Sequence, residues 1–182
     1  MCKQCETNPV YEFTNKRKLC VGCFIKYFQK KVFYTIRKFK MAHSGEIIGY
    51  KNNRNFRDVV LEDVLKIFSE KANAKFTKSL KRADKVAVSS SLDSEADEIT
   101  HKLIKESSKN LGFSPVEGKI IKPLCLFLDE EILLYAKIKK LKFKTKKEKK
   151  DKISSFVDEL EKKHPEIKRA IVNGMMKIEN LK

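Results

Sequence analysis

The chain has 182 residues, of which 41% are hydrophobic, so it is long enough and apolar enough to bury a core. No apolar stretch approaches the roughly 20 residues of a membrane-spanning helix, which argues against an integral helical membrane protein and predicts a cytoplasmic location. The net charge of +17 would repel itself in a compact domain unless a polyanion bound to it. Nucleic acid is the most common partner of this kind, and an anionic membrane surface is the alternative.

Four cysteines at the N-terminus form two Cys-x-x-Cys pairs that are fourteen residues apart. They are Cys2, Cys5, Cys20 and Cys23. Each pair places two thiolates on one tight turn, and the two pairs together could complete a tetrahedral shell around one ion. Zn²⁺ suits four sulfur ligands, and four protein ligands leave no open position, so we predict a structural zinc site. Two disulfides, or reduced thiols without a metal, remain open as alternatives.

Apolar residues recur at three- and four-residue spacing from Phe24 onward, which predicts an amphipathic helix directly after the cysteine pairs. Lysines and arginines occupy mostly the other faces of this helix, where they could follow a phosphate backbone. A solvated outer face is the plainer interpretation of any single lysine. The first predicted RNA-contacting surface consists of Arg17, Lys18, Lys26, Lys30, Lys31, Arg37 and Lys38. We therefore predict a zinc ribbon with a basic amphipathic helix in residues 1–40.

The next segment, residues 41–150, alternates short apolar runs with helical patterns. This alternation predicts an α/β domain with a small parallel sheet. In chain order we predict strands at 45–50, 85–89 and 119–124, and helices at 58–82, from about 91 to 104, and at 130–140. Cys125 lies in an apolar run and is predicted to be a core residue rather than a reactive thiol.

A lysine-rich stretch near the end of this segment interrupts the periodic pattern and predicts a basic loop. It supplies a second predicted RNA-contacting surface, formed by Lys144, Lys146, Lys147, Lys149 and Lys150. Residues 151–182 are predicted to form a C-terminal helical segment of two helices, the second of which begins at Pro165.

The sequence shows no arrangement that is typical of an enzyme active site. A phosphate cradle needs glycine, because backbone amides can approach a phosphate only where side chains are absent. The six glycines are never adjacent, and neither a Walker loop nor a dinucleotide fingerprint is present. The three histidines lie far apart, and Asp93 with Glu95 fits helix capping better than a catalytic carboxylate pair. We therefore predict no catalytic residues.

Several segments, taken together, resemble the cytosolic tRNA 2-thiolation proteins of the PP-loop ATPase superfamily, which place sulfur on the wobble uridine of tRNA. The cysteine pairs and the following helix resemble the N-terminal zinc finger of that family. Residues 83–96, Ala-Asp-Lys-Val-Ala-Val-Ser-Ser-Ser-Leu-Asp-Ser-Glu-Ala, resemble a family strand–turn–helix, and 121–136 and 156–165 resemble later elements. The resemblance implies a reduced PP-loop (HUP-like) parallel sheet with flanking helices and C-terminal helices.

The chain departs from this family where the chemistry takes place. Catalytic members carry Ser-Gly-Gly-x-Asp-Ser after the first strand, and residues 45–54 lack its two glycines and its serines. The family's catalytic cysteines, its Gly-His-Asn turn and its second zinc knuckle have no counterpart here. We expect about a third of the family's usual length to be deleted.

The resemblance therefore implies a truncated form of the non-catalytic partner subunit, of the cytoplasmic tRNA 2-thiolation protein 2 family. Such a subunit would not be an enzyme by itself, and it would bind tRNA and a catalytic thiolation subunit as a heterodimer. One alternative is a zinc-ribbon RNA-binding or ribosome-associated protein with no role in thiolation. Another alternative is an active thiolase in which an unusual loop binds ATP.

Overall fold

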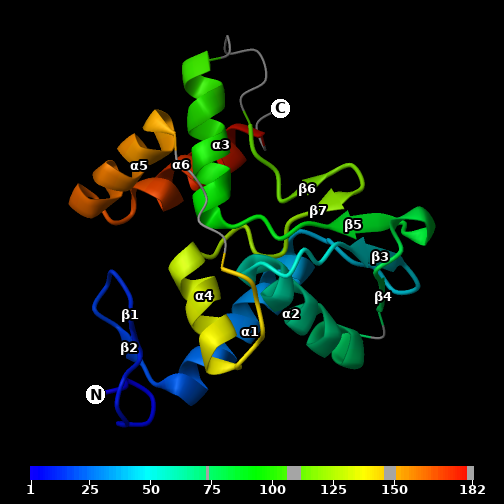
Figure 1. Cartoon of the computed structure of the whole chain (residues 1–182), viewed down its shortest axis with the longest axis horizontal. Helices are drawn as coiled ribbons and strands as arrows, with labels where there is room; N and C mark the ends of the chain where they lie inside the picture. The colour runs from blue at the N-terminus through cyan, green and yellow to red at the C-terminus, as the bar shows by residue number, and fades with distance from the viewer. Residues whose placement is uncertain (73, 106–111, 146–150, 180–182) are drawn as a thin grey trace.

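The computed structural model of the chain describes residues 1–72, 74–105, 112–145 and 151–179. A five-stranded sheet has helices on both faces, and a separate two-stranded hairpin lies near the N-terminus (Figure 1). The predicted α/β class, a parallel sheet with flanking helices, is confirmed. No helix among the described residues is long and apolar enough to cross a lipid bilayer.

The N-terminal hairpin joins β1 (Tyr11–Glu12) to β2 (Lys18–Leu19), which pair antiparallel. Helix α1 (Val21–Lys38) begins two residues later, at the second cysteine pair. Its buried residues recur mainly at four-residue spacing, as the apolar pattern predicted, and they lie on one side of the helix. The predicted amphipathic helix after the cysteine pairs is confirmed.

The sheet has the strand order β4-β3-β5-β7-β6. These strands are β3 (Ile47–Tyr50), β4 (Lys75–Thr77), β5 (Lys85–Ala87), β6 (Val116–Glu117) and β7 (Ile120–Ile121). All pairings are parallel except that of the edge strand β6 with β7. The chain goes from β3 to β4 on one side and then to β5 on the other, so the direction of winding reverses at β3. Ligands bind at such a reversal, beyond the carboxyl ends of the strands.

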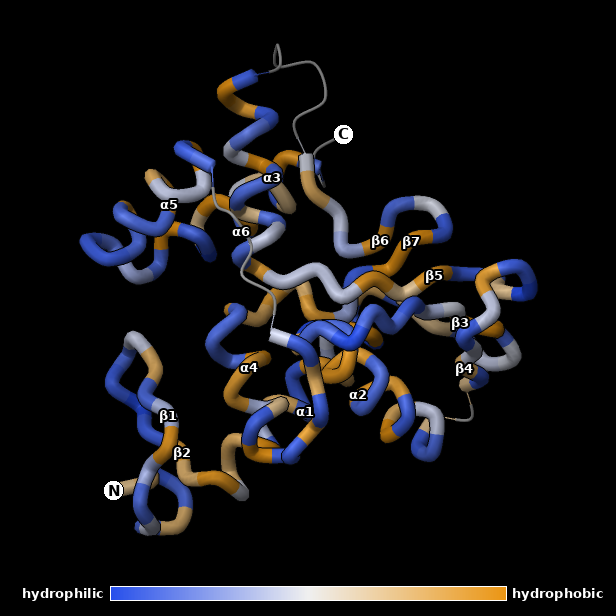
Figure 2. Tube along the Cα trace, in the orientation of Figure 1, coloured by the Kyte–Doolittle hydropathy of each residue, from blue (hydrophilic) through white to orange (hydrophobic). Residues whose placement is uncertain are grey.

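The remaining helices divide between the two faces of the sheet. They are α2 (Phe56–Ala72), α3 (Leu92–Lys105), α4 (Asp129–Ile138), α5 (Lys152–Lys163) and α6 (Ile167–Glu179). Figure 1 shows α1, α2 and α4 on one side of the sheet and α3, α5 and α6 on the other. The buried apolar residues form two clusters that follow the same division. Helices on both faces explain why β7 consists of two isoleucines and why β5 continues from Lys85 with Val86 and Ala87; Figure 2 shows both strands largely in the hydrophobic colour.

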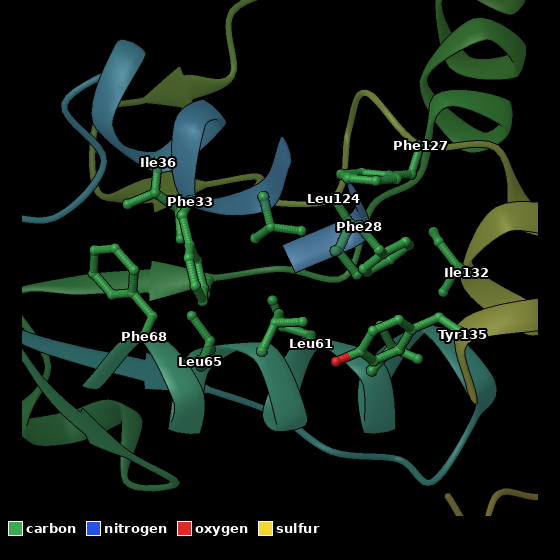
Figure 3. Close-up of a cluster of buried hydrophobic side chains, with 14 of the residues drawn as sticks. Phe28, Phe33, Ile36, Leu61, Leu65, Phe68, Leu124, Phe127, Ile132 and Tyr135 are labelled. Atoms are coloured by element: carbon green, nitrogen blue, oxygen red, sulfur yellow. The ribbon is translucent and has the colours of Figure 1, made fainter. Parts of the chain in front are cut away.

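The larger core cluster is centred on aromatic side chains from α1 and α4. The rings of Phe28 and Tyr135 stack with centroids 4.3 Å apart, and Phe127 lies 4.3 Å from Phe28 (Figure 3). Leu61 and Leu65 of α2 close the other side of this cluster. Helix α1 therefore belongs to the main core of the α/β domain and is not confined to the cysteine-rich end.

The predicted long helix at 58–82 is wrong. Helix α2 ends at Ala72, and the chain then forms the edge strand β4 and a short 3₁₀ turn at Leu80–Arg82. Phe76 and Leu80 continue the apolar spacing, but β4 gains backbone hydrogen bonds by pairing with β3. The pairing of short edge strands depends on residues far away in the sequence, which also explains why β6 was not predicted.

Candidate functional site

The four N-terminal cysteine side chains converge at the start of helix α1. Cys2 and Cys5 lie on a turn that is closed by a hydrogen bond from Glu6 N to Cys2 O at 3.0 Å. Cys20 is the N-cap of α1, and Cys23 lies in its first turn. All four Sγ atoms lie within 4.8 Å of one another, and Cys5 Sγ is 3.3 Å from Cys20 Sγ and 3.7 Å from Cys23 Sγ. The cysteine group can therefore hold a metal ion.

These separations suit one ion better than a cluster. Four sulfurs at about 2.3 Å from a tetrahedral Zn²⁺ lie about 3.8 Å from one another. An iron–sulfur cubane assigns one cysteine to each iron, so its ligand sulfurs must surround a larger body. A hydrogen bond from the Thr7 side chain is the main reason why the pKa of Cys20 falls to about 6. This thiol therefore readily becomes the thiolate that metal binding requires.

The hairpin between the cysteine pairs is fastened to the C-terminal half of the chain. Tyr11 Oη donates a hydrogen bond to Glu130 Oε1 at 2.8 Å, and the Thr14 hydroxyl donates to Glu166. A pocket of about 280 Å³ lies between the hairpin and this half of the chain. We call it the hairpin pocket. Its lining includes Tyr11, Phe13, Arg17, Tyr27, Glu130 and Arg169.

The first predicted RNA-contacting surface is only partly assembled in the structure. Lys26, Lys30, Arg37 and Lys38 are exposed on α1. With the exposed ring of Tyr34 they recur at three- and four-residue spacing, so they share the outer face of the helix. Twelve residues of α-helix extend about 18 Å, which is the length of this basic stripe.

Other members of that surface have partners within the protein. Lys31 Nζ donates a hydrogen bond to Leu126 O at 2.7 Å and lies 4.3 Å from the centre of the Phe127 ring. Burial lowers the pKa of Lys31 to about 8. Lys18 Nζ lies 3.2 Å from Glu12 Oε2 on the paired strand of the hairpin. Helical spacing alone did not distinguish the inward Lys31 from its outward neighbours, because lysine tolerates both positions.

The second predicted RNA-contacting surface lies mostly outside the described residues. Lys144 is exposed, and its backbone N–H donates to Arg54 O at 2.6 Å. Lys146, Lys147, Lys149 and Lys150 fall beyond the described range. The lysine-rich stretch thus begins beside the basic loop 51–55, which follows strand β3.

A crevice lies at the carboxyl ends of β3 and β5, where the direction of winding reverses. It contains a pocket of about 280 Å³. The lining combines apolar side chains with a few polar groups, and consists of Lys51, Asn53, Asp58, Leu80, Val86, Ala87, Val88 and Ser89. Apolar walls with a small number of polar groups are typical of small-molecule sites. We call this region the β3/β5 crevice.

The carboxylate of Asp58 occupies the anion-favouring position in this crevice. Asp58 is 4% exposed and lies in the first turn of α2, where the helix dipole stabilises negative charge. It accepts hydrogen bonds from Asn53 N at 2.8 Å, from Asn55 Nδ2 at 3.0 Å and from the Ser89 hydroxyl. A protein carboxylate therefore stands where a glycine-rich loop would hold a phosphate.

A buried ion cluster on the other face of the sheet was missed by the sequence analysis. Lys168 of α6 is 3% exposed, and its Nζ lies 2.5 Å from Asp93, 2.7 Å from Glu161 and 2.9 Å from Asp158. The three carboxylates could hold a metal ion by their spacing alone, but the lysine ammonium is the cation among them. Lys168 precedes the buried Val172 by four residues, and this inward spacing was the signal in the sequence.

A second buried ion pair links α3 to the strands. Lys122 Nζ lies 3.2 Å from Glu95 Oε2 and 2.9 Å from Glu117 Oε1. Burial raises the pKa of Glu95, although Ser90 and Lys122 both donate hydrogen bonds to its carboxylate. Glu95 is thus a structural group and does not cap the helix. Cys125 is fully buried, as predicted for a core residue.

Comparisons with known proteins agree with this architecture. No protein-family model and no curated protein matches the sequence. Among solved structures, the chain is similar to the U34-tRNA thiolase NcsA from Methanococcus maripaludis, determined with its [4Fe-4S] cluster. The TM-score is 0.79 at 18% identity, and the match covers 97% of this chain and 86% of the thiolase chain. At this identity the likeness shows a shared fold.

The likeness corrects two predictions from the sequence. The prediction that this chain is not an enzyme is contradicted, because a protein with the same fold over nearly the whole chain is a tRNA thiolase. The expected deletion of about a third of the length is wrong in comparison with this thiolase, since 86% of it has a counterpart here. The absence of a glycine-rich loop from the sequence therefore does not by itself exclude an enzyme.

Proposed function

We propose that this chain acts as an enzyme in the thiolation of the wobble uridine of tRNA. The observation that carries this proposal is the shared fold over 97% of the chain with a U34-tRNA thiolase. The net charge of +17 supports a polyanionic substrate, and the four-cysteine group supports a metal-stabilised N-terminal unit. A cytoplasmic location remains a prediction.

The β3/β5 crevice is the proposed place where a nucleotide and the uridine meet. Its apolar wall, with Leu80 and Val86, suits a nucleobase, and Lys51 and Ser89 offer polar contacts. The carboxylate of Asp58 would repel a triphosphate at the same end of α2. Because Mg²⁺ can bridge carboxylates and phosphates, we expect ATP binding to depend strongly on Mg²⁺. Isothermal titration with ATP, with and without Mg²⁺, measures this directly.

The basic stripe on α1 is the proposed tRNA-contacting surface, with Lys18 and Lys144 as further candidates. Lys31 is left out because its ammonium is buried against backbone and aromatic groups. Changing both Lys26 and Lys30 to Glu should lower tRNA affinity and reduce its salt dependence, since phosphate contacts release counterions. A variant with the same charge change at the exposed Lys81 and Lys119 is the matched control.

Zinc is the proposed ion of the four-cysteine group, because the sulfur separations suit a single tetrahedral ion. Metal analysis of protein purified without added metal should give one Zn²⁺ per chain and no iron. Iron and acid-labile sulfide in the purified protein would contradict this assignment and favour a cluster.

The decisive test is a thiolation assay. The purified chain is incubated with tRNA, ATP, Mg²⁺ and a sulfide donor, and the tRNA nucleosides are analysed by mass spectrometry for 2-thiouridine. Formation of 2-thiouridine at the wobble position supports the proposal. No product by the chain alone or with its co-purifying proteins, together with equal binding to unrelated RNA, would refute it.

A second thiolation subunit is the proposed protein partner, which the resemblance to heterodimeric tRNA 2-thiolation proteins supports. Affinity purification from the native cells followed by mass spectrometry tests this partner. Recovery of ribosomal proteins in place of a thiolation subunit would favour the alternative, a zinc-ribbon RNA-binding or ribosome-associated protein.

A further inference from the structure

The hairpin pocket contains a cation, Arg17, that has no carboxylate partner among the described residues. Arg17 precedes strand β2, and its guanidinium lies 4.5 Å from the centre of the Phe13 ring and 5.2 Å from that of Tyr27. Its Nε atom is buried and has no hydrogen-bond partner among the described residues. An arginine donor that is buried without an acceptor costs free energy unless a ligand satisfies it.

The other charged groups of the hairpin pocket already have an ion-pair or hydrogen-bond partner. Arg169 lies 3.3 Å from Glu131 and 3.5 Å from Glu166. Glu130 accepts the hydrogen bond of Tyr11, and Glu12 pairs with Lys18. Of the two arginines in the described lining, Arg17 is thus the one without a carboxylate partner.

The chemistry of the pocket suits one unpaired nucleotide. A guanidinium donates two parallel hydrogen bonds to a phosphate, and aromatic side chains or the guanidinium plane itself can stack on a base. Phe13 and Tyr27 already hold the guanidinium in a fixed orientation. The pocket volume of about 280 Å³ is close to the smallest volumes of small-molecule sites, which begin at about 300 Å³. The pocket therefore suits a single nucleotide rather than a duplex.

We propose that the hairpin pocket binds one unstacked nucleotide of an RNA substrate, with Arg17 donating to its phosphate. This inference deepens the proposed function and rests on it for the identity of the ligand as RNA. The pocket joins the hairpin of the cysteine-rich unit to the C-terminal half of the chain, so an RNA bound there would contact both.

The test measures binding of a fluorescein-labelled single-stranded oligouridylate to the full chain by anisotropy. Arg17→Gln should weaken binding by about tenfold or more, because a charge-assisted hydrogen bond is lost. It should also reduce the salt slope by about 0.7, the contribution of one phosphate contact on a single strand. Lys16→Gln is the matched control, since it removes one charge from the same hairpin at an exposed position, and it should change affinity less than about twofold.

A second measurement guards against misfolding of the variant. Photo-crosslinking of 5-bromouridine RNA to the wild-type chain should map to Phe13 or Tyr27. Arginine-to-lysine substitution, Arg17→Lys, should retain the fold and charge but lose the two parallel hydrogen bonds, so it should still weaken binding. Inorganic phosphate should compete only at far higher concentration than the oligonucleotide.

The outcomes separate this inference from the proposed function. If Arg17→Gln binds RNA no more weakly than Lys16→Gln, or if crosslinks map to the exposed residues of α1 but to neither Phe13 nor Tyr27, the pocket assignment is overturned even where thiolation is observed. If the oligonucleotide crosslinks in the pocket but no tRNA thiolation occurs, the pocket stands and the thiolation proposal fails. Absence of any RNA binding overturns both.

Discussion

Replacing Lys168 by Met should cause a large loss of stability. The side chain is 3% exposed and holds carboxylates from α3 and α5 at 2.5–2.9 Å. Removing the cation leaves the carboxylates of Asp93, Asp158 and Glu161 close together without the ammonium that they share. Loss of one partner from a buried ion cluster costs about 3–5 kcal/mol. This is a large share of the roughly 5–15 kcal/mol that stabilises an ordinary domain.

The loss should depend on pH in one direction. Burial alone would lower the pKa of Lys168, but hydrogen bonds to Asp158, Asp93 and Glu161 outweigh it and raise the pKa. A raised lysine pKa contributes stability that is complete below the unfolded value of 10.5 and is lost only at higher pH. The deficit of Lys168→Met should therefore be constant near neutral pH. It should shrink in acid, because burial raises the pKa of Glu161 and protonation of this carboxyl group removes part of the repulsion.

Urea unfolding followed by circular dichroism measures this deficit, with Lys177→Met at an exposed position of the same helix as the control. Adding Asp158→Asn and Glu161→Gln to Lys168→Met should restore part of the stability, because the remaining repulsion is removed. A deficit below about 1 kcal/mol at neutral pH, or one unchanged by the added substitutions, would refute the reasoning.

Three further predictions concern the metal group, the crevice and acid stability. Cys5→Ser should lose bound zinc, as metal analysis would show, and should lower the midpoint of thermal unfolding. Asp58→Asn should increase ATP affinity several-fold in titration calorimetry without Mg²⁺ and should weaken the Mg²⁺ dependence, since a repelling carboxylate is removed. Burial alone would raise the pKa of Glu62, but hydrogen bonds from Asn52 and two lysines lower it to about 2. The stability from Glu62 is therefore present above about pH 4.5 and lost towards pH 2, so Glu62→Gln should be destabilising at pH 7 but not near pH 2.

Matched variants keep these tests specific. Cys125→Ser changes a buried cysteine outside the metal group, so retained zinc in Cys5→Ser but not in Cys125→Ser would contradict the metal assignment. Asp84→Asn alters a carboxylate at the other end of the sheet, where it accepts a hydrogen bond from Ile47 N at 2.8 Å. Equal ATP affinity in Asp58→Asn and Asp84→Asn would argue against a nucleotide in the crevice. An unfolding midpoint of Glu62→Gln that tracks the wild type from pH 7 to pH 2 would contradict the role of Glu62.

The local signals in the sequence were sufficient for most of the secondary structure. Short apolar runs correctly placed β3 and β5. Helical spacing of apolar residues placed α1, α3 and α4 within a few residues. Two Cys-x-x-Cys pairs correctly predicted one four-cysteine group, because each pair already places two thiols on one turn. Where the spacing was continuous but the chain changed from helix to edge strand, at residues 72–77, the prediction failed.

The sequence by itself determined the fold class, the cysteine group and the surplus of positive charge, because each depends on spacing within a few residues or on composition. The tertiary structure alone decided which charges are free. Lys31 turns inward to Leu126, 95 residues away, and Lys168 to Asp93, 75 residues away. Nε of Arg17, in contrast, is buried and has no acceptor among the described residues. No local pattern encodes such pairings, since burial and partner distance arise only when distant segments pack together.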